Sequence, residues 1–187
     1  MNAATNSKTA KSPSEFDRLL LDQIKNEFAA SQQYVAVAVF FDANDLPRLA
    51  GRFYEQATEE RRHAMMMVRY LIDNDVDVNI PGIADVITEF SSVREPVELA
   101  LRQEKEVTEQ ITRLAHTARD TGDYLGEQFI QWFLKEQVEE VSQMNTLLTI
   151  VDRAGDNLFN IEDFVAREWT GTPGPDATEP AVAGEGG

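Results

Sequence analysis

Four glutamates and one histidine occupy positions where the predicted helices need apolar side chains. The glutamates fall on four different helices, at Glu27, Glu60, Glu104 and Glu140. His63 follows Glu60 by three residues, so the two share a helical face. A buried carboxylate is costly unless a cation neutralises it. One glutamate from each helix plus a Glu-x-x-His pair predicts a di-iron site inside a four-helix bundle, because oxygen-rich ligands suit iron or manganese better than zinc.

A metal-free bundle is the alternative. A single glutamate on an apolar stripe usually reflects a misjudged helix phase or a side chain that snorkels to solvent. Four such residues on four helices, with a histidine one turn away, favour the metal site.

The apolar residues around these positions recur at helical spacing over four long segments. Capping boxes predict that the first segment starts at Ser12 with Glu15, and the third at Ser92 with Glu95. Each candidate ligand lies near the middle of its segment, so the carboxylates are expected to meet at one level. The expected helices cover about 12–41, 46–74, 92–120 and 123–154.

The segment 75–91 has no helical stripe, and its length suits a long crossover that leaves the second and third helices parallel. A short fifth helix is expected at about 157–168. The resulting all-α domain, 12–168, is expected to lie between a disordered arm at 1–11 and a disordered tail at 169–187, which is rich in Gly, Pro, Ala and Glu.

Composition excludes several classes of function. The net charge of −16 argues against binding nucleic acid and favours attraction of cations. The absence of cysteine excludes disulfides and thiolate sites. No apolar run of about 18 residues exists, and the polar N-terminus does not resemble a signal peptide. We expect a cytoplasmic protein without a membrane partner.

The chain resembles the ferritins over about residues 14–168, specifically the bacterial non-haem type and most of all the mycobacterial and related actinobacterial ferritins. Helix order, spacing and ligand types all agree with that family. The resemblance implies a ferritin-like four-helix bundle. It is carried by Tyr34 and by segments 26–28, 59–64, 103–104 and 131–140.

The resemblance also implies roles for the ligand candidates. Glu27, Glu60 and His63 would hold a first iron. Glu60 would bridge to a second iron, which Glu104 and Glu140 complete.

Other positions are expected next to the iron pair. Gln137 lies one turn before Glu140 and would be a polar neighbour. Tyr34 matches a family tyrosine that can donate an electron and a proton, although a tyrosine hydrogen-bonded to a core carboxylate is the simpler interpretation. Trp132 could be a redox neighbour or, more simply, a packing residue. The residues expected to take part in catalysis are Glu27, Tyr34, Glu60, His63, Glu104, Gln137 and Glu140.

Glu59, Glu136 and Glu139 match a possible third iron position of bacterial ferritins, with a solvated acidic face as the alternative. Haem is not expected. Gln143 stands where bacterioferritins have a second Glu-x-x-His histidine, and Arg61 stands where they have the haem-binding methionine.

The resemblance implies an iron-storage ferroxidase that oxidises Fe²⁺ with O₂ or H₂O₂ inside a homo-oligomeric shell of 24 subunits. The fifth helix would pack around a four-fold axis, and Asp123 and Glu127 would guide iron inward. A di-iron oxidase of the rubrerythrin type, a mini-ferritin and a structural scaffold or cargo protein remain as alternatives. The tail 169–187 could dock into a compartment shell or be a plain solvated end.

Overall fold

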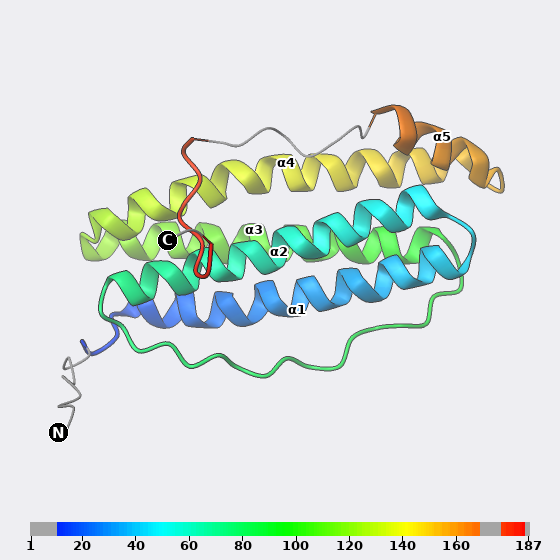
Figure 1. Cartoon of the computed structure of the whole chain (residues 1–187). Helices are drawn as coiled ribbons and strands as arrows, with labels where there is room; N and C mark the ends of the chain where they lie inside the picture. Colours follow the sequence, from blue (N-terminus) through cyan, green and yellow to red (C-terminus); the bar gives the residue numbers. More distant parts are fainter. Residues whose placement is uncertain (1–10, 169–176, 186–187) are drawn as a thin grey trace, which may run out of the picture.

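All regular secondary structure in the described residues, 11–168 and 177–185 of the computed structural model, is helical. Four long helices form a bundle, and a short fifth helix lies at one end of it (Figure 1). This confirms the expected all-α architecture. Within the described ranges, no helix is long and apolar enough to cross a bilayer. The helices are α1 (Glu15–Ala43), α2 (Pro47–Asp73), α3 (Arg94–Thr121), α4 (Tyr124–Ala154) and α5 (Leu158–Glu168).

The bundle consists of two helical hairpins, α1–α2 and α3–α4, joined by a crossover that runs the length of the molecule (Figure 1). As predicted, the crossover makes α2 and α3 run in the same direction. The Gln33 side chain fixes its path. Gln33 Nε2 donates to the carbonyl of Ile87 at 2.7 Å, and the Ile87 N–H donates back to Gln33 Oε1 at 2.9 Å. The amide group thus satisfies both backbone groups of one crossover residue.

The start of α1 differs from the prediction by two residues. Ser14, not Ser12, is the N-cap, and the reciprocal partner is Asp17, not Glu15. The Asp17 N–H donates to Ser14 Oγ at 3.1 Å, and the Ser14 N–H donates to Asp17 Oδ2 at 2.8 Å. Asp17 makes this bond because it faces the bundle and is buried, whereas Glu15 points to solvent.

The capping box predicted at Ser92 is not formed, because the N-cap of α3 is Val93, which makes no side-chain cap hydrogen bond. Glu95 instead holds the residue before Ser92. The Ser91 N–H donates to Glu95 Oε2 at 2.7 Å, and the Ser91 hydroxyl donates to the other carboxylate oxygen.

The N-terminus of α2 has no side-chain cap of its own, because the N-cap residue is Leu46. Glu162 from α5 supplies the missing acceptors. Its two carboxylate oxygens accept the N–H groups of Arg48 at 2.9 Å and Leu49 at 3.0 Å. A carboxylate at this end also matches the positive end of the helix dipole. The fifth helix is therefore anchored to the second by hydrogen bonds as well as by packing.

The core is divided into two apolar clusters. One surrounds Phe41 and Phe53 near α5, and the other surrounds Ile24 and Ile111 at the opposite end. Neither cluster includes the buried glutamates, which lie between the two in the sequence of every helix. A polar layer therefore crosses the middle of the bundle, as the mid-helix positions predicted.

Residues 177–185, here called the C-terminal segment, pack against the bundle, in contrast to the disordered tail expected over 169–187. The segment crosses from α4 to α2 (Figure 1). Val182 is 92% covered, being 8% exposed, and belongs to the second apolar cluster. The Ala183 N–H donates to the carbonyl of Met65 at 3.2 Å. The segment has a single valine among alanine, glycine, proline, threonine and glutamate, which explains why composition missed this contact. Residues 169–176 and 186–187, like the arm at 1–10, lie outside the described residues.

Arg62 of α2 fixes the C-terminal segment electrostatically. It pairs with Glu179 at 2.9 Å and with Glu185 at 3.2 Å. The two acids lie on either side of Val182, so ion pairs flank the apolar contact.

Candidate metal centre

The five predicted ligands are all buried in the polar layer. Their exposed fractions are 1% for Glu27, 2% for Glu60, 2% for Glu104, 3% for Glu140 and 6% for His63. They come from α1, α2, α3 and α4, each of which is continuous through the layer. Charged groups this deeply buried need compensating partners.

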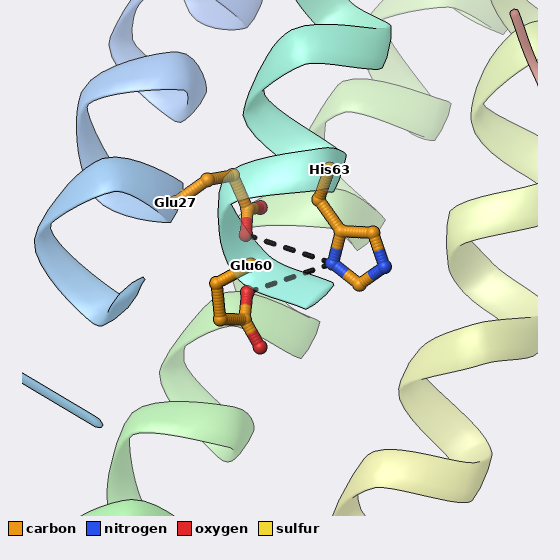
Figure 2. Close-up of side chains that lie close together, drawn as sticks. All are labelled: Glu27, Glu60 and His63. Carbon is orange, nitrogen blue, oxygen red and sulfur yellow. Dashed lines mark ion pairs between the residues drawn. The ribbon is translucent and has the colours of Figure 1, made fainter. Parts of the chain in front are cut away.

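Glu27, Glu60 and His63 form the tightest part of the site (Figure 2). His63 Nδ1 lies 3.5 Å from Glu60 Oε2 and 4.0 Å from Glu27 Oε2. Each residue offers one ligand atom, and these three atoms all lie within 4.8 Å of one another. Oε2 of Glu27 is buried and has no hydrogen-bond partner among the described residues. An acceptor oriented this way toward an imidazole and a second carboxylate fits a cation.

Glu104 is held by side chains from two other helices. The Tyr34 hydroxyl of α1 donates to Glu104 Oε1. Gln137 Nε2 of α4 donates to Glu104 Oε2 at 3.2 Å and to the Glu104 carbonyl at 3.2 Å. Gln137 is therefore a polar neighbour of this carboxylate, and Tyr34 is a buried tyrosine bonded to a core carboxylate, as the simpler interpretation of that residue expected.

Two glutamines that the sequence analysis did not single out also hold carboxylates of the layer. Gln23 Nε2 donates to Glu27 Oε1 at 2.9 Å, and Gln56 Nε2 donates to Glu140 Oε2 at 2.5 Å. Both glutamines are buried. Each lies four residues before a predicted ligand on its own helix, and that spacing is the signal that could have identified them.

Burial dominates the electrostatics of the layer. Loss of hydration raises the pKa of Glu27 well above its ordinary value, and the Glu60 carboxylate raises it further. Burial likewise raises the pKa of Glu60, with Glu104 and Glu140 adding to the effect. The pKa of Glu140 is raised well above its ordinary value by burial and by Glu104.

Glu104 and Tyr34 are shifted in the same direction. Burial raises the Glu104 pKa, and the hydrogen bonds from Tyr34 and Gln137 oppose that rise. Burial and the Glu104 charge raise the pKa of Tyr34, so this phenol keeps its proton. Without a cation the layer therefore retains protons on its carboxylates, and cations binding there would displace them.

Glu59, Glu136 and Glu139 lie beside the layer but are more accessible. Glu59 is 27% exposed, Glu136 is intermediate and Glu139 is exposed. Burial raises the pKa of Glu136, and the nearby charges of Glu139 and Glu59 add to this rise. Their oxygens do not converge as closely as the first group, which is the one three-ligand cluster found among the described residues.

The remaining predicted positions have local partners. Trp132 lies edge-on to His63, with ring centroids 5.6 Å apart, and also packs on Phe133. Asp123 is the N-cap of α4, where Oδ1 accepts the Gly126 N–H at 2.9 Å. Glu127 accepts from the Arg119 guanidinium at 2.7 Å. Asp123 and Glu127 therefore have structural roles within the chain, and a role in guiding iron stays a hypothesis.

A four-helix bundle with a long crossover and a buried carboxylate–histidine cluster defines the class of protein. Residues 18–154 match the family model described as the Ferritin-like domain. The chain is 63% identical over 170 residues to Ferritin BfrB of Mycolicibacterium smegmatis, covering 91% of this chain and 93% of that protein. It is 35% identical over 138 residues to the Bacterial non-heme ferritin of Staphylococcus aureus, covering 74% of this chain and 83% of the relative.

Among solved structures, an open pore ferritin from Archaeoglobus fulgidus matches with a TM-score of 0.79 at 25% identity, covering 82% of this chain and 96% of that one. The chain belongs to the ferritin family. Iron storage and metal binding follow from that membership and from the carboxylate–histidine cluster. The resemblance to bacterial non-haem and mycobacterial ferritins is confirmed.

Proposed function

We propose that the chain is a ferroxidase that oxidises Fe²⁺ to Fe³⁺ with O₂ at a paired iron site within each subunit, and that it stores the ferric product in a hollow shell of 24 subunits. The observation that carries this proposal is the convergence of Glu27, Glu60 and His63, whose ligand atoms lie within 4.8 Å of one another in a buried layer.

The iron ions are the substrate, and the charge of the layer suits a pair of them. Glu27, Glu60 and His63 would bind the first Fe²⁺. Glu60 would bridge to the second, which Glu104 and Glu140 would complete. Four buried carboxylates balance two divalent cations. Hard oxygen ligands also favour Fe³⁺ over Fe²⁺, which promotes the loss of one electron from each iron.

Tyr34 is the residue best placed to assist oxidation. Its hydroxyl already donates a hydrogen bond to Glu104, and its ring is fully buried. A phenol in this position can give up an electron from its ring while its proton passes to the adjacent carboxylate. Gln137 would hold Glu104 in the orientation that binds the second iron.

A third iron would bind at Glu59, Glu136 and Glu139 on its way from the pair to the cavity. Support comes from the proximity of the Glu59 and Glu139 charges to Glu136 and from the greater exposure of the three carboxylates compared with the paired site. Haem is not part of the proposal, because Arg61 and Gln143 replace the residues that it would need.

Exposed apolar residues on the subunit support assembly. Phe159 of α5 is 85% exposed, and Ile80, Ile83 and Ile87 of the crossover are 38–58% exposed. Large apolar side chains that are exposed on one subunit can be buried against a neighbouring subunit in an assembly. The net charge of −16 per chain would concentrate Fe²⁺ around and inside a shell. Docking of the tail into a compartment would require the C-terminal segment to leave its own subunit.

A di-iron oxidase that does not store iron is the competing function. One experiment separates the two. The wild-type protein is sized by light scattering and then given excess aerobic Fe²⁺, alongside Glu60→Ala/His63→Ala. The matched control is Glu109→Ala/His116→Ala, which removes the same residue types from the exposed side of α3.

Storage predicts a particle of about 0.5 MDa from 21.0 kDa subunits and an iron content far above two per chain. Fast oxidation should persist in the control and disappear in Glu60→Ala/His63→Ala. A small particle that stops at about two irons per chain would establish the oxidase instead.

A further inference from the structure

A buried arginine lies next to the paired site. Arg52 of α2 is 9% exposed and precedes Glu59 by two turns. Its Nη1 lies 3.7 Å from Glu59 Oε2, and its Nη2 donates a short hydrogen bond to Gln143 Oε1. Arginine side chains are rarely buried unless a carboxylate pairs with them. The pairing of Arg52 with Glu59 is therefore the contact to explain.

We propose that Arg52 is a positioning residue that neutralises Glu59 and thereby limits the binding of a third divalent cation beside the iron pair. This inference rests on the proposed ferroxidase function and adds a control on how iron leaves the pair.

Charge balance is the first argument. Two divalent cations neutralise the four buried carboxylates of the layer, which leaves Glu59, Glu136 and Glu139 as additional carboxylates beside them. Arg52 places a positive charge next to one of these, Glu59. A third divalent cation at Glu59 must therefore compete with a guanidinium that is already there.

The second argument is the reach of the Arg52 charge into the layer itself. Arg52 Nη2 donates to Gln143, which lies one turn after Glu140 on α4. Gln56, one turn after Arg52 on α2, donates to Glu140 Oε2 at 2.5 Å. Arg52 therefore lies near the carboxylate assigned to the second iron as well as beside Glu59. Replacing it changes the electrostatic balance at both places.

The third argument is that Arg52 lies beside a cavity and a second carboxylate. It lines a cavity of about 250 Å³ between α2 and α5, whose wall also contains Glu55. Glu55 Oε2 is 3.8 Å from Arg52 Nη1, and the Glu55 side chain is 58% exposed. The same Nη1 atom therefore lies beside both carboxylates at once. A cation that binds Glu59 would leave Arg52 with Glu55 as its remaining carboxylate partner.

The test is calorimetric titration of the iron-free full-length assembly with Zn²⁺, which binds without redox chemistry. Arg52→Met removes the charge with little change in length, and Arg52→Lys keeps it. The matched control is Arg48→Met, one turn earlier on α2 and lining the same cavity. Cation binding to the acidic exterior should be the same in all of these proteins.

We expect Arg52→Met to bind the third Zn²⁺ about five- to tenfold more tightly than wild type, the factor that corresponds to a partly exposed ion pair. Arg52→Lys and Arg48→Met should match wild type. A third affinity unchanged in Arg52→Met, or an Arg52→Lys protein that behaves like Arg52→Met, would overturn the proposal.

If Arg52→Met does not assemble, a second variant, Glu59→Gln, tests the proposal. Glu59→Gln leaves the Arg52 charge unbalanced beside Glu140, so the second Zn²⁺ should bind roughly fivefold more weakly. An unchanged second affinity would contradict the role of Arg52. A wild-type protein that binds no pair of Zn²⁺ ions would instead contradict the assignment of the paired site.

Discussion

The hydroxyl of Tyr34 in α1 donates a hydrogen bond to Glu104 in α3. This bond joins the two helical hairpins at the level of the candidate iron pair, and both partners are at most 2% exposed. Tyr34 also packs against Phe53, with ring centroids 5.7 Å apart. The ring and the hydroxyl of this residue therefore have separable roles.

Tyr34→Phe tests the hydroxyl alone, because the ring contact with Phe53 is kept. We expect stopped-flow oxidation of Fe²⁺ to slow by roughly ten- to a hundredfold, within the range for loss of a positioned proton donor. The free energy of unfolding should decrease by about 1.5–3 kcal/mol, because the Glu104 carboxylate loses the hydrogen bond from the Tyr34 hydroxyl. Tyr54→Phe on the exposed side of α2 is the control, and equal rates in both variants would exclude a role for the Tyr34 hydroxyl.

The stability of the iron-free protein should fall as pH rises above about 4.5, the ordinary value for a glutamate. Burial raises the pKa values of Glu27, Glu60 and Glu140 in the folded state, so the native protein binds protons that the unfolded chain has released. That contribution is complete below the unfolded value and is lost as pH rises through the folded values.

Urea unfolding in the presence of a chelator, at about pH 5 and about pH 8, measures this dependence. The general repulsion of an acidic chain acts in the same direction, so the comparison with Glu140→Gln isolates the site. The variant should lose less stability over this interval than wild type. Parallel pH dependence in the two proteins would show that Glu140 does not hold a proton in the folded state.

Glu162→Ala should destabilise the subunit by about 1 kcal/mol, because two N–H groups at the start of α2 lose their acceptors. For a chain of this size the midpoint of thermal unfolding should fall by about 2–4 °C. Asp163→Ala, the exposed neighbour on α5, is the control and should leave the midpoint unchanged. If both alanine variants have the same unfolding midpoint as wild type, Glu162 does not stabilise the start of α2.

Val182→Asp should release the C-terminal segment, because it places a charge in the apolar contact made by an 8% exposed side chain. Hydrogen exchange reports the result directly, since the Ala183 N–H is bonded to the Met65 carbonyl. That amide should exchange faster by about tenfold or more, while Ala181→Asp, at an exposed position, should not affect it. Equal protection in both variants would show that Val182 does not hold the segment.

Periodicity alone was sufficient to predict the helical architecture. The stripes identified four long helices, the crossover and the buried layer, because each pattern is local and repeats along one helix. Contacts between distant segments were not predictable in the same way. Glu162 caps a helix 113 or more residues away, and Arg62 pairs with an acid 123 residues away. Neither pairing leaves a periodic trace in the sequence.

The candidate site follows the same division: the ligands on the apolar stripes were predictable from the sequence, and the contacts between helices were not. Glu27, Glu60 and His63 were identified because polar residues on an apolar stripe are conspicuous. Arg52 lies on the same helix as Glu60 but resembles an ordinary surface residue in the sequence, and the one signal for Gln56 is its position four residues before Glu60. Only the three-dimensional arrangement reveals that Gln56 bonds to Glu140 and that Arg52 lies beside Glu59.

The polar layer between the two apolar clusters also changes how the helices are held together along their length. Each cluster is close-packed and resists rearrangement. The layer is held instead by hydrogen bonds between side chains, and its carboxylates repel one another unless protons or cations neutralise them. All four long helices pass through it unbroken, so the two ends cannot separate. The level at which charge enters and leaves the subunit is thus the level at which apolar packing contributes least to holding the helices together.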